Sequence, residues 1–62
     1  MDAATLRRYR KELRLTQAEL GHELGVTRNS VTRWEIGMHP IPAPVAKLIE
    51  RLVRERRRPK RE

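Results

Sequence analysis

The most informative stretch of this sequence is residues 13–37, which read LRLTQAELGHELGVTRNSVTRWEIG. Thr16 and Glu19 have the spacing of a capping box, in which a hydroxyl and a carboxylate satisfy free backbone amides at a helix start. Leu20 and Leu24 follow four residues apart, on one face of a helix. Gly25 can adopt the left-handed conformation that ends helices. These signals predict a helix over residues 17–24.

A second short helix is expected after a turn of only three residues, 25–27. The hydroxyl of Thr27 can cap this helix, which should run over residues 28–36, and Gly37 provides the stop. Gly21 lies inside the preceding helix, where glycine costs up to about 1 kcal/mol relative to alanine. We therefore expect its missing side chain to let the following helix cross closely. Two short helices joined by such a turn are typical of a helix-turn-helix, whose second helix enters the major groove of DNA.

Two further helices are expected on either side of this pair. Asp2 can cap a helix over residues 3–13. Prolines in alternate positions over residues 40–44 favour an extended connection, and Pro44 suits the first turn of a helix over residues 44–57. The apolar stripe of this last helix comprises Val45, Leu48, Ile49, Leu52 and Val53. The sequence thus predicts an all-α, compact helix-turn-helix domain of four helices, at about 3–13, 17–24, 28–36 and 44–57.

The composition restricts the class of protein and of partner. A chain of 62 residues has room for one domain, which buries roughly 60% of its unfolded surface. It has no Cys, so disulfides and thiolate metal sites are excluded. The net charge of +7 indicates a polyanionic partner but does not by itself distinguish DNA, RNA and an acidic membrane. Without a signal peptide or a long apolar run, we expect a soluble, cytoplasmic protein that does not enter the membrane.

Charge also suggests how the chain is divided. Residues 1–56 are expected to form the DNA-binding domain, and residues 57–62 a basic, flexible tail. Three roles remain open for the tail. It could contact phosphates without sequence preference, keep the protein soluble, or bind a partner.

The third helix separates into two faces at about 100° per residue. Its inward face holds Val31, Trp34 and Glu35. Its outward face holds Arg28, Asn29, Thr32, Arg33 and Ile36. Arginine can bond guanine, asparagine can bond adenine, and threonine can contact a thymine methyl. The outward face is therefore expected to read base edges, whereas Trp34 is expected to pack in the core. Ile36 could touch a thymine methyl or a sugar, or simply be exposed.

Residues 13–37 resemble the helix-turn-helix of the phage repressor and Cro family, and the likeness extends more weakly over residues 6–52. The matching features are Thr16-Gln17 at the start of the second helix, Gly21, Gly25 in the turn, Val31, and Trp34-Glu35-x-Gly37 at the end of the third helix. Each feature alone is weak, but together they are specific. The resemblance implies a lambda-repressor-like arrangement of the four helices.

The resemblance also implies roles for individual residues. In that family the glutamine matching Gln17 bonds a DNA phosphate and braces the first residue of the recognition helix, here Arg28. The positions implied to contact bases are Arg28, Asn29, Thr32 and Arg33. The positions implied to lie near phosphates are Thr16, Gln17, Thr27, Ser30 and His39. Arg10 and Glu35 are implied to form a buried, structural ion pair, which fits the inward direction of both residues in the helical pattern.

These patterns predict a sequence-specific, double-stranded DNA-binding transcriptional regulator. We expect a repressor that binds an inverted-repeat operator as a homodimer, at least on DNA, because one recognition helix contacts only a few base pairs. The apolar stripe of the fourth helix could supply the dimer surface. If that stripe is consumed by the core of its own subunit, dimers would form only on DNA.

Two other interpretations remain open. One is an antitoxin or adaptor that mainly binds a protein partner, with autoregulatory DNA binding, for which an exposed patch on the fourth helix would be evidence. The other is an RNA-binding module, although single-stranded RNA readers use aromatic platforms and this chain has only Tyr9 and Trp34.

Catalysis and ligand binding are not expected. His22 and His39 lack the spacing of metal ligands, and Ser30 has no histidine and acid partners for nucleophilic attack. The sequence has no glycine-rich phosphate loop. We therefore expect no enzyme activity, no metal, no cofactor and no small-molecule ligand.

Overall fold

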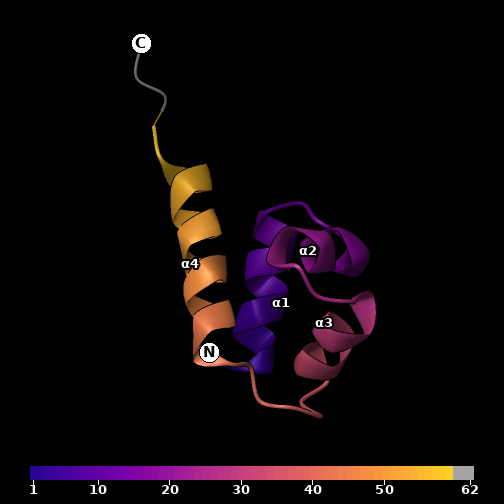
Figure 1. The fold of residues 1–62 in the computed structure, drawn as a ribbon. Coiled ribbons are helices and arrows are strands. Elements are labelled where there is room, and N and C mark those ends of the chain that lie inside the picture. The colour runs from indigo at the N-terminus through magenta and orange to yellow at the C-terminus, as the bar shows by residue number, and fades with distance from the viewer. Residues whose placement is uncertain (60–62) are drawn as a thin grey trace.

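Four helices surround a single core in the computed structural model, which describes residues 1–59 (Figure 1). The helices are α1 (Ala3–Glu12), α2 (Gln17–Leu24), α3 (Arg28–Glu35) and α4 (Ala43–Arg57). No strand occurs within these 59 residues, so the predicted all-α class is confirmed. The predicted bounds of α2 are confirmed, whereas α1 and α3 each end one residue earlier than expected and α4 begins one residue earlier.

Side-chain caps begin the first three helices, as their sequences predict. The carboxylate of Asp2 accepts a hydrogen bond from the Thr5 backbone amide at 2.7 Å. The capping box at α2 is complete, since Thr16 and Glu19 each accept a hydrogen bond from the other's backbone amide. Thr27 caps α3 through its hydroxyl alone, which accepts a hydrogen bond from the Ser30 amide. α4 has no side-chain cap, and it begins after Pro42, so that Pro44 is its second residue rather than its first.

α2 ends where a glycine reverses the backbone. Gly25 has a φ of +73°, and its amide donates to the carbonyl of His22. The following amide, of Val26, donates to Gly21 at 2.8 Å. This pair of bonds satisfies carbonyls that a helix end otherwise leaves free. α3 ends with the same pair of bonds around Gly37.

α1 ends in the same way without a glycine. Arg14 has a φ of +58°, the left-handed region that residues other than Gly and Asn rarely adopt. Its amide donates to Lys11, and the next amide, of Leu15, donates to Arg10. The sequence does not predict this conformation because neither Gly nor Asn stands at the position.

Gly21 is required by a close backbone approach. A Cβ at this position would lie 2.9 Å from the carbonyl oxygen of Val26 and 3.2 Å from that of Thr27. These are backbone atoms, which cannot move aside as a flexible side chain could. The expected close crossing is thus confirmed, but the chain that approaches is the turn leading into α3 rather than α3 itself.

The core joins all four helices. Its buried members are Leu6, Leu20, Val31, Trp34, Ile49 and Val53. Trp34 is only 8% exposed, so its predicted place beneath the recognition helix is confirmed. Leu48 belongs to the expected stripe of α4 but is 36% exposed. Most of that stripe is therefore covered by the protein's own core.

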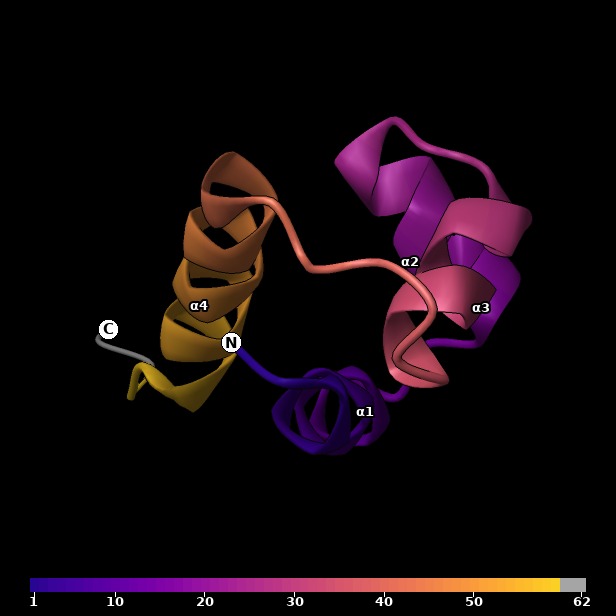
Figure 2. The same cartoon turned by 90° about the horizontal axis from the view of Figure 1, so that it is seen from below.

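α1 contacts both the helix-turn-helix and α4, which also meet directly through α2. It packs against both α3 and α4, and the latter two helices lie at opposite edges of the molecule (Figure 2). The connection after α3 crosses from one edge to the other. This arrangement leaves the outer side of α3 uncovered by α4.

Candidate DNA-binding interface

The outward face of α3 carries three exposed hydrogen-bonding side chains. Arg28, Asn29 and Arg33 are all exposed. Within residues 1–59, neither arginine forms an ion pair, and Asn29 makes no side-chain hydrogen bond. Their donors and acceptors are therefore available to a ligand. Thr32, the fourth expected base-reading residue, is partly buried at the edge of this face beside α2.

Hydroxyl groups mark the N-termini of α2 and α3. The oxygen of Thr16 accepts the Glu19 amide at 3.1 Å, and that of Thr27 accepts the Ser30 amide at 3.3 Å. The hydroxyls of Thr27 and Ser30 are themselves 3.2 Å apart. The free amides at such helix starts carry partial positive charge and favour anions. The expected phosphate contacts at these residues are compatible with this geometry.

Gln17 has different partners from those that the family resemblance implies. Its amide nitrogen donates to Glu35 Oε1 at 3.3 Å, and its amide oxygen accepts the hydroxyl of Thr32 at 3.0 Å. Within residues 1–59 no hydrogen bond links Gln17 to Arg28, so its contact to a phosphate and its bracing of Arg28 stay predictions for the DNA complex. The orientation of the Gln17 amide has an electrostatic cause. The carboxylate of Glu35 attracts the amide N–H, so the amide oxygen faces the hydroxyl of Thr32, one turn beyond Arg28.

Arg10 and Glu35 form the expected ion pair between α1 and α3. Arg10 Nε donates to Glu35 Oε2 at 2.6 Å, and Nη2 donates to Oε1 at 3.1 Å. The remaining nitrogen, Nη1, donates to the carbonyl of Leu15 at 3.0 Å. Glu35 is only 4% exposed and Arg10 is 15% exposed. The guanidinium thus links the start of the helix-turn-helix to its end.

Arg7 adds a contact that the sequence did not reveal. Its Nη2 donates to the backbone carbonyl of Glu35 at 3.0 Å, and its Nε lies 4.0 Å from the carboxylate. Arg7 precedes Arg10 by three residues, which places both on neighbouring parts of one helix face. That spacing is the only sequence signal for its role.

Opposing effects set the protonation of the pair. Burial raises the pKa of the Glu35 carboxyl, but hydrogen bonds from Arg10 and Gln17 and the charges of Arg10 and Arg7 lower it by more, so that the pKa lies below its ordinary value. The hydrogen bond to Glu35 raises the pKa of Arg10, against the opposite effect of burial. Both groups are therefore charged at neutral pH, which suits a structural ion pair.

The loop after α3 holds the last of the expected phosphate contacts. His39 is exposed there, and its backbone amide donates to the carbonyl of Arg33 at 3.4 Å. Ile36 at the end of α3 is 62% exposed and contributes nothing to the core. Both side chains are thus accessible next to the recognition helix.

The C-terminal arginines contact α1. Arg57 donates to both carboxylate oxygens of Glu12, at 2.6 and 2.7 Å, and Arg56 donates to the Glu12 backbone carbonyl at 2.7 Å. Arg57 is the last residue of α4 and so does not begin a separate tail. Residues 60–62 of the expected tail lie outside the described residues.

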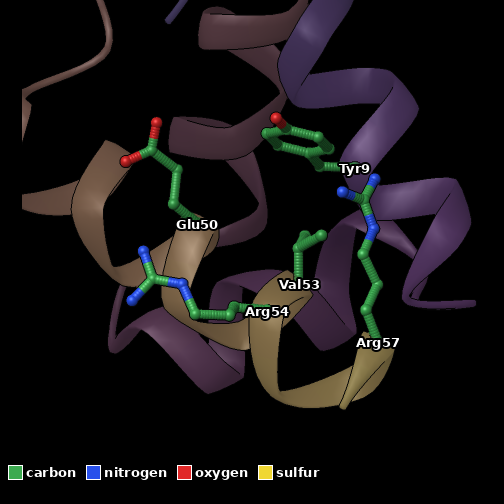
Figure 3. A pocket seen from close by; sticks show the side chains of 5 residues that line it. All are labelled: Tyr9, Glu50, Val53, Arg54 and Arg57. Atoms are coloured by element: carbon green, nitrogen blue, oxygen red, sulfur yellow. The ribbon is translucent and has the colours of Figure 1, made fainter. Parts of the chain in front are cut away.

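A surface groove separates α1 from α4 at this end of the molecule. It is lined by Tyr9, Glu50, Val53, Arg54 and Arg57 (Figure 3). Arg57 reaches toward the Tyr9 ring, with its guanidinium carbon 6.0 Å from the ring centroid, whereas Arg54 extends away from it. The groove lies on the α1–α4 side, so its charges do not belong to the recognition face.

The fold and the exposed face of α3 define a helix-turn-helix domain. A family model described as helix-turn-helix matches residues 6–58. The chain therefore belongs to the helix-turn-helix family of phage repressor and Cro-type regulators, and it is a DNA-binding transcription regulator. No curated protein and no solved structure gave a match. None of the helices in residues 1–59 has both the length and the apolar character needed to cross a membrane.

Proposed function

We propose that this regulator is a repressor that binds an inverted-repeat operator as a homodimer, with α3 in the major groove. The observation that supports this most strongly is the exposed face of α3, where Arg28, Asn29 and Arg33 have no partners among residues 1–59. The pair of Arg10 and Glu35 holds this helix against α1. A rigidly held helix can present its side chains to base edges in one register.

The side chains divide by the part of DNA that they would contact. Arg28 and Arg33 suit bidentate bonding to guanine, and Asn29 suits bidentate bonding to adenine. Thr32 completes the base-reading set. Contacts to the phosphates are assigned to Thr16, Gln17, Thr27, Ser30 and His39. The phosphate contacts fix the position of the domain, and the base contacts provide the sequence preference.

We propose that dimers form on the DNA rather than before binding. Ile49 and Val53 of α4 are buried in their own subunit, and Leu48 is the one large apolar residue of α4 that is exposed. This leaves little apolar surface for a stable dimer in solution. Two half-sites about 34 Å apart would place two copies side by side on one face of the duplex. Occupancy of both half-sites would block access to a promoter.

The burial of the apolar residues of α4 and of the two aromatic residues gives little support to the adaptor and RNA-binding alternatives. An adaptor that mainly grips a protein partner needs an exposed patch on α4, where only Leu48 is available. A reader of single-stranded RNA needs stacking platforms. Trp34 is buried beneath α3, and Tyr9 is partly buried against α4.

Selection of bound sequences from random duplex DNA tests the proposal. We expect a palindromic consensus with one half-site for each subunit. Three variants show whether α3 is the source of the sequence preference. Arg28→Ala and Arg33→Ala should reduce the base preference at one position of each half-site. Arg54→Ala, which removes the same charge from α4, should select the same consensus as wild type. Recovery of no consensus, or stronger binding to RNA than to duplex DNA in competition, would refute the proposed function.

A further inference from the structure

We propose that Thr32 contributes to operator recognition through its methyl group, because Gln17 and the backbone of α3 hold its hydroxyl inside the protein. This inference rests on the proposed base-reading role of α3. In it, Thr32 is the residue that determines specificity at one thymine, and Gln17 is a positioning residue that acts through Thr32.

The orientation of the Gln17 amide follows from its neighbours. Glu35 is paired with Arg10 through both carboxylate oxygens, so the carboxylate is ionised and can only accept hydrogen bonds. The group of Gln17 that lies 3.3 Å from Glu35 Oε1 must therefore be the amide nitrogen. The amide oxygen must then point the other way, toward Thr32.

The direction of the Thr32 hydroxyl follows in turn. The Gln17 amide oxygen can only accept, so the hydroxyl at 3.0 Å from it must donate. The second neighbour of that hydroxyl is the carbonyl oxygen of Arg28 at 3.1 Å, which is also an acceptor only. The single hydroxyl hydrogen is therefore donated within the protein, either to the Gln17 amide oxygen or to the Arg28 carbonyl oxygen.

This restricts what Thr32 can offer to a base pair. Guanine O6 and N7, adenine N7 and thymine O4 are acceptors that need a donor. The hydroxyl of Thr32 could donate to them only by leaving both protein partners. Its oxygen can still accept, but only from adenine N6 or cytosine N4, so at a thymine the side chain offers its methyl. The Cγ2 methyl stands about 120° away from the oxygen around the Cα–Cβ bond, so it is turned away from those partners. Its matching feature in the major groove is the C5-methyl group of thymine.

The test replaces the two parts of the Thr32 side chain separately. Thr32→Val keeps the methyl and removes the hydroxyl, whereas Thr32→Ser does the reverse. On the selected operator, each thymine in turn is replaced by deoxyuridine, which lacks the methyl, and duplex affinity is measured. We expect wild type and Thr32→Val to lose roughly fourfold at one position, the value for one buried methyl-sized group. Thr32→Ser should bind both duplexes equally.

Either of two results would overturn the inference. If Thr32→Ser keeps the wild-type sensitivity to deoxyuridine, another side chain contacts the thymine methyl. If Thr32→Val binds the operator more weakly than wild type while Thr32→Ser binds it equally well, the hydroxyl reads the base. The inference also fails if no single deoxyuridine lowers the affinity of the wild-type protein. Thermal unfolding and affinity for random duplex DNA show whether each variant is folded.

A third variant covers the case in which Thr32→Val does not fold. Thr32→Ala should lose the sensitivity to deoxyuridine together with Thr32→Ser. A hydroxyl that reads the base would instead let Thr32→Ser bind the unmodified operator as tightly as wild type, with Thr32→Ala binding it more weakly. The failures can be told apart. If selection yields no consensus, the proposed function is wrong. If it yields one that Thr32→Ser reads normally, only the role given to the methyl is wrong.

Discussion

The carboxylate of Glu35 lies against the guanidinium of Arg10 with two hydrogen bonds, of 2.6 and 3.1 Å, and joins the end of α3 to the last turn of α1. Gln17 and Arg7 also donate to Glu35, one to its carboxylate and one to its backbone carbonyl. Glu35 is therefore the point at which three segments of the chain meet behind the recognition helix. Its hydrogen bonds hold α3 against α1, and only 4% of its side chain is exposed.

Removal of this carboxylate should unfold the domain rather than change its sequence preference. Glu35→Ala leaves the charge of Arg10 partly buried without a partner, and loss of one member of a buried pair typically costs about 3 to 5 kcal/mol. Urea denaturation should show this loss in the free energy of unfolding. A stable, folded Glu35→Ala protein that selects a different operator would contradict the assignment.

The stability of the domain should depend on pH through the same residue. The folded pKa of Glu35 lies below its ordinary value of 4.5, so its contribution is fully present above that value and is lost as the pH falls through the folded pKa. Glu35→Gln removes this contribution. The difference in melting temperature between wild type and Glu35→Gln should therefore shrink as the pH is lowered below about 4.5. A difference that stays constant from pH 7 to about pH 3 would argue against an ionised Glu35 as the stabilising form.

Gly21→Ala should destabilise the domain although alanine is the better helix former. The added Cβ would press on the carbonyl of Val26 at 2.9 Å, and crowding of this kind typically costs about 1 to 3 kcal/mol. His22→Ala is a suitable control, because His22 is exposed in the same helix. Thermal unfolding measures both variants. An increase in the stability of Gly21→Ala would show that the turn can move away.

Arg14→Gly should stabilise the domain. The residue has a φ of +58°, which costs an L residue roughly 1 kcal/mol and costs glycine almost nothing. The gain in the free energy of unfolding should reach up to about 1 kcal/mol. Lys11→Gly, a change within α1 itself, should act in the opposite direction by a similar amount. Equal destabilisation by both substitutions would contradict the left-handed conformation of Arg14.

Local signals in the sequence predicted most of the fold. The spacing of Thr16 and Glu19 and the glycine at Gly25 placed α2 correctly, because caps act on backbone groups only a few residues away. The same reasoning could not predict the left-handed backbone of Arg14. There the tertiary path of the chain overrides the preference of the residue. Leu48 fits the apolar period of α4, yet the period alone does not show how wide the covered stripe is.

The candidate site was predictable in its residue types but not in its internal bonds. The helical pattern places Arg28, Asn29 and Arg33 on one face, and the structure shows all three exposed. The bond between Gln17 and Thr32 depends on where α2 and α3 cross and on the carboxylate that orients the amide. Such contacts join side chains 15 or 18 residues apart and leave no periodic signal in the sequence.

The most direct test of the central claim compares Arg33→Ala with Arg54→Ala on two duplexes, the selected operator and a random sequence, in the same buffer. Base reading by α3 predicts that Arg33→Ala costs about 1 to 3 kcal/mol on the operator, with a much smaller loss on random DNA. Arg54→Ala, an equal loss of charge on α4, should weaken neither duplex selectively. If Arg33→Ala weakens both duplexes equally, α3 contributes only charge and does not read the sequence.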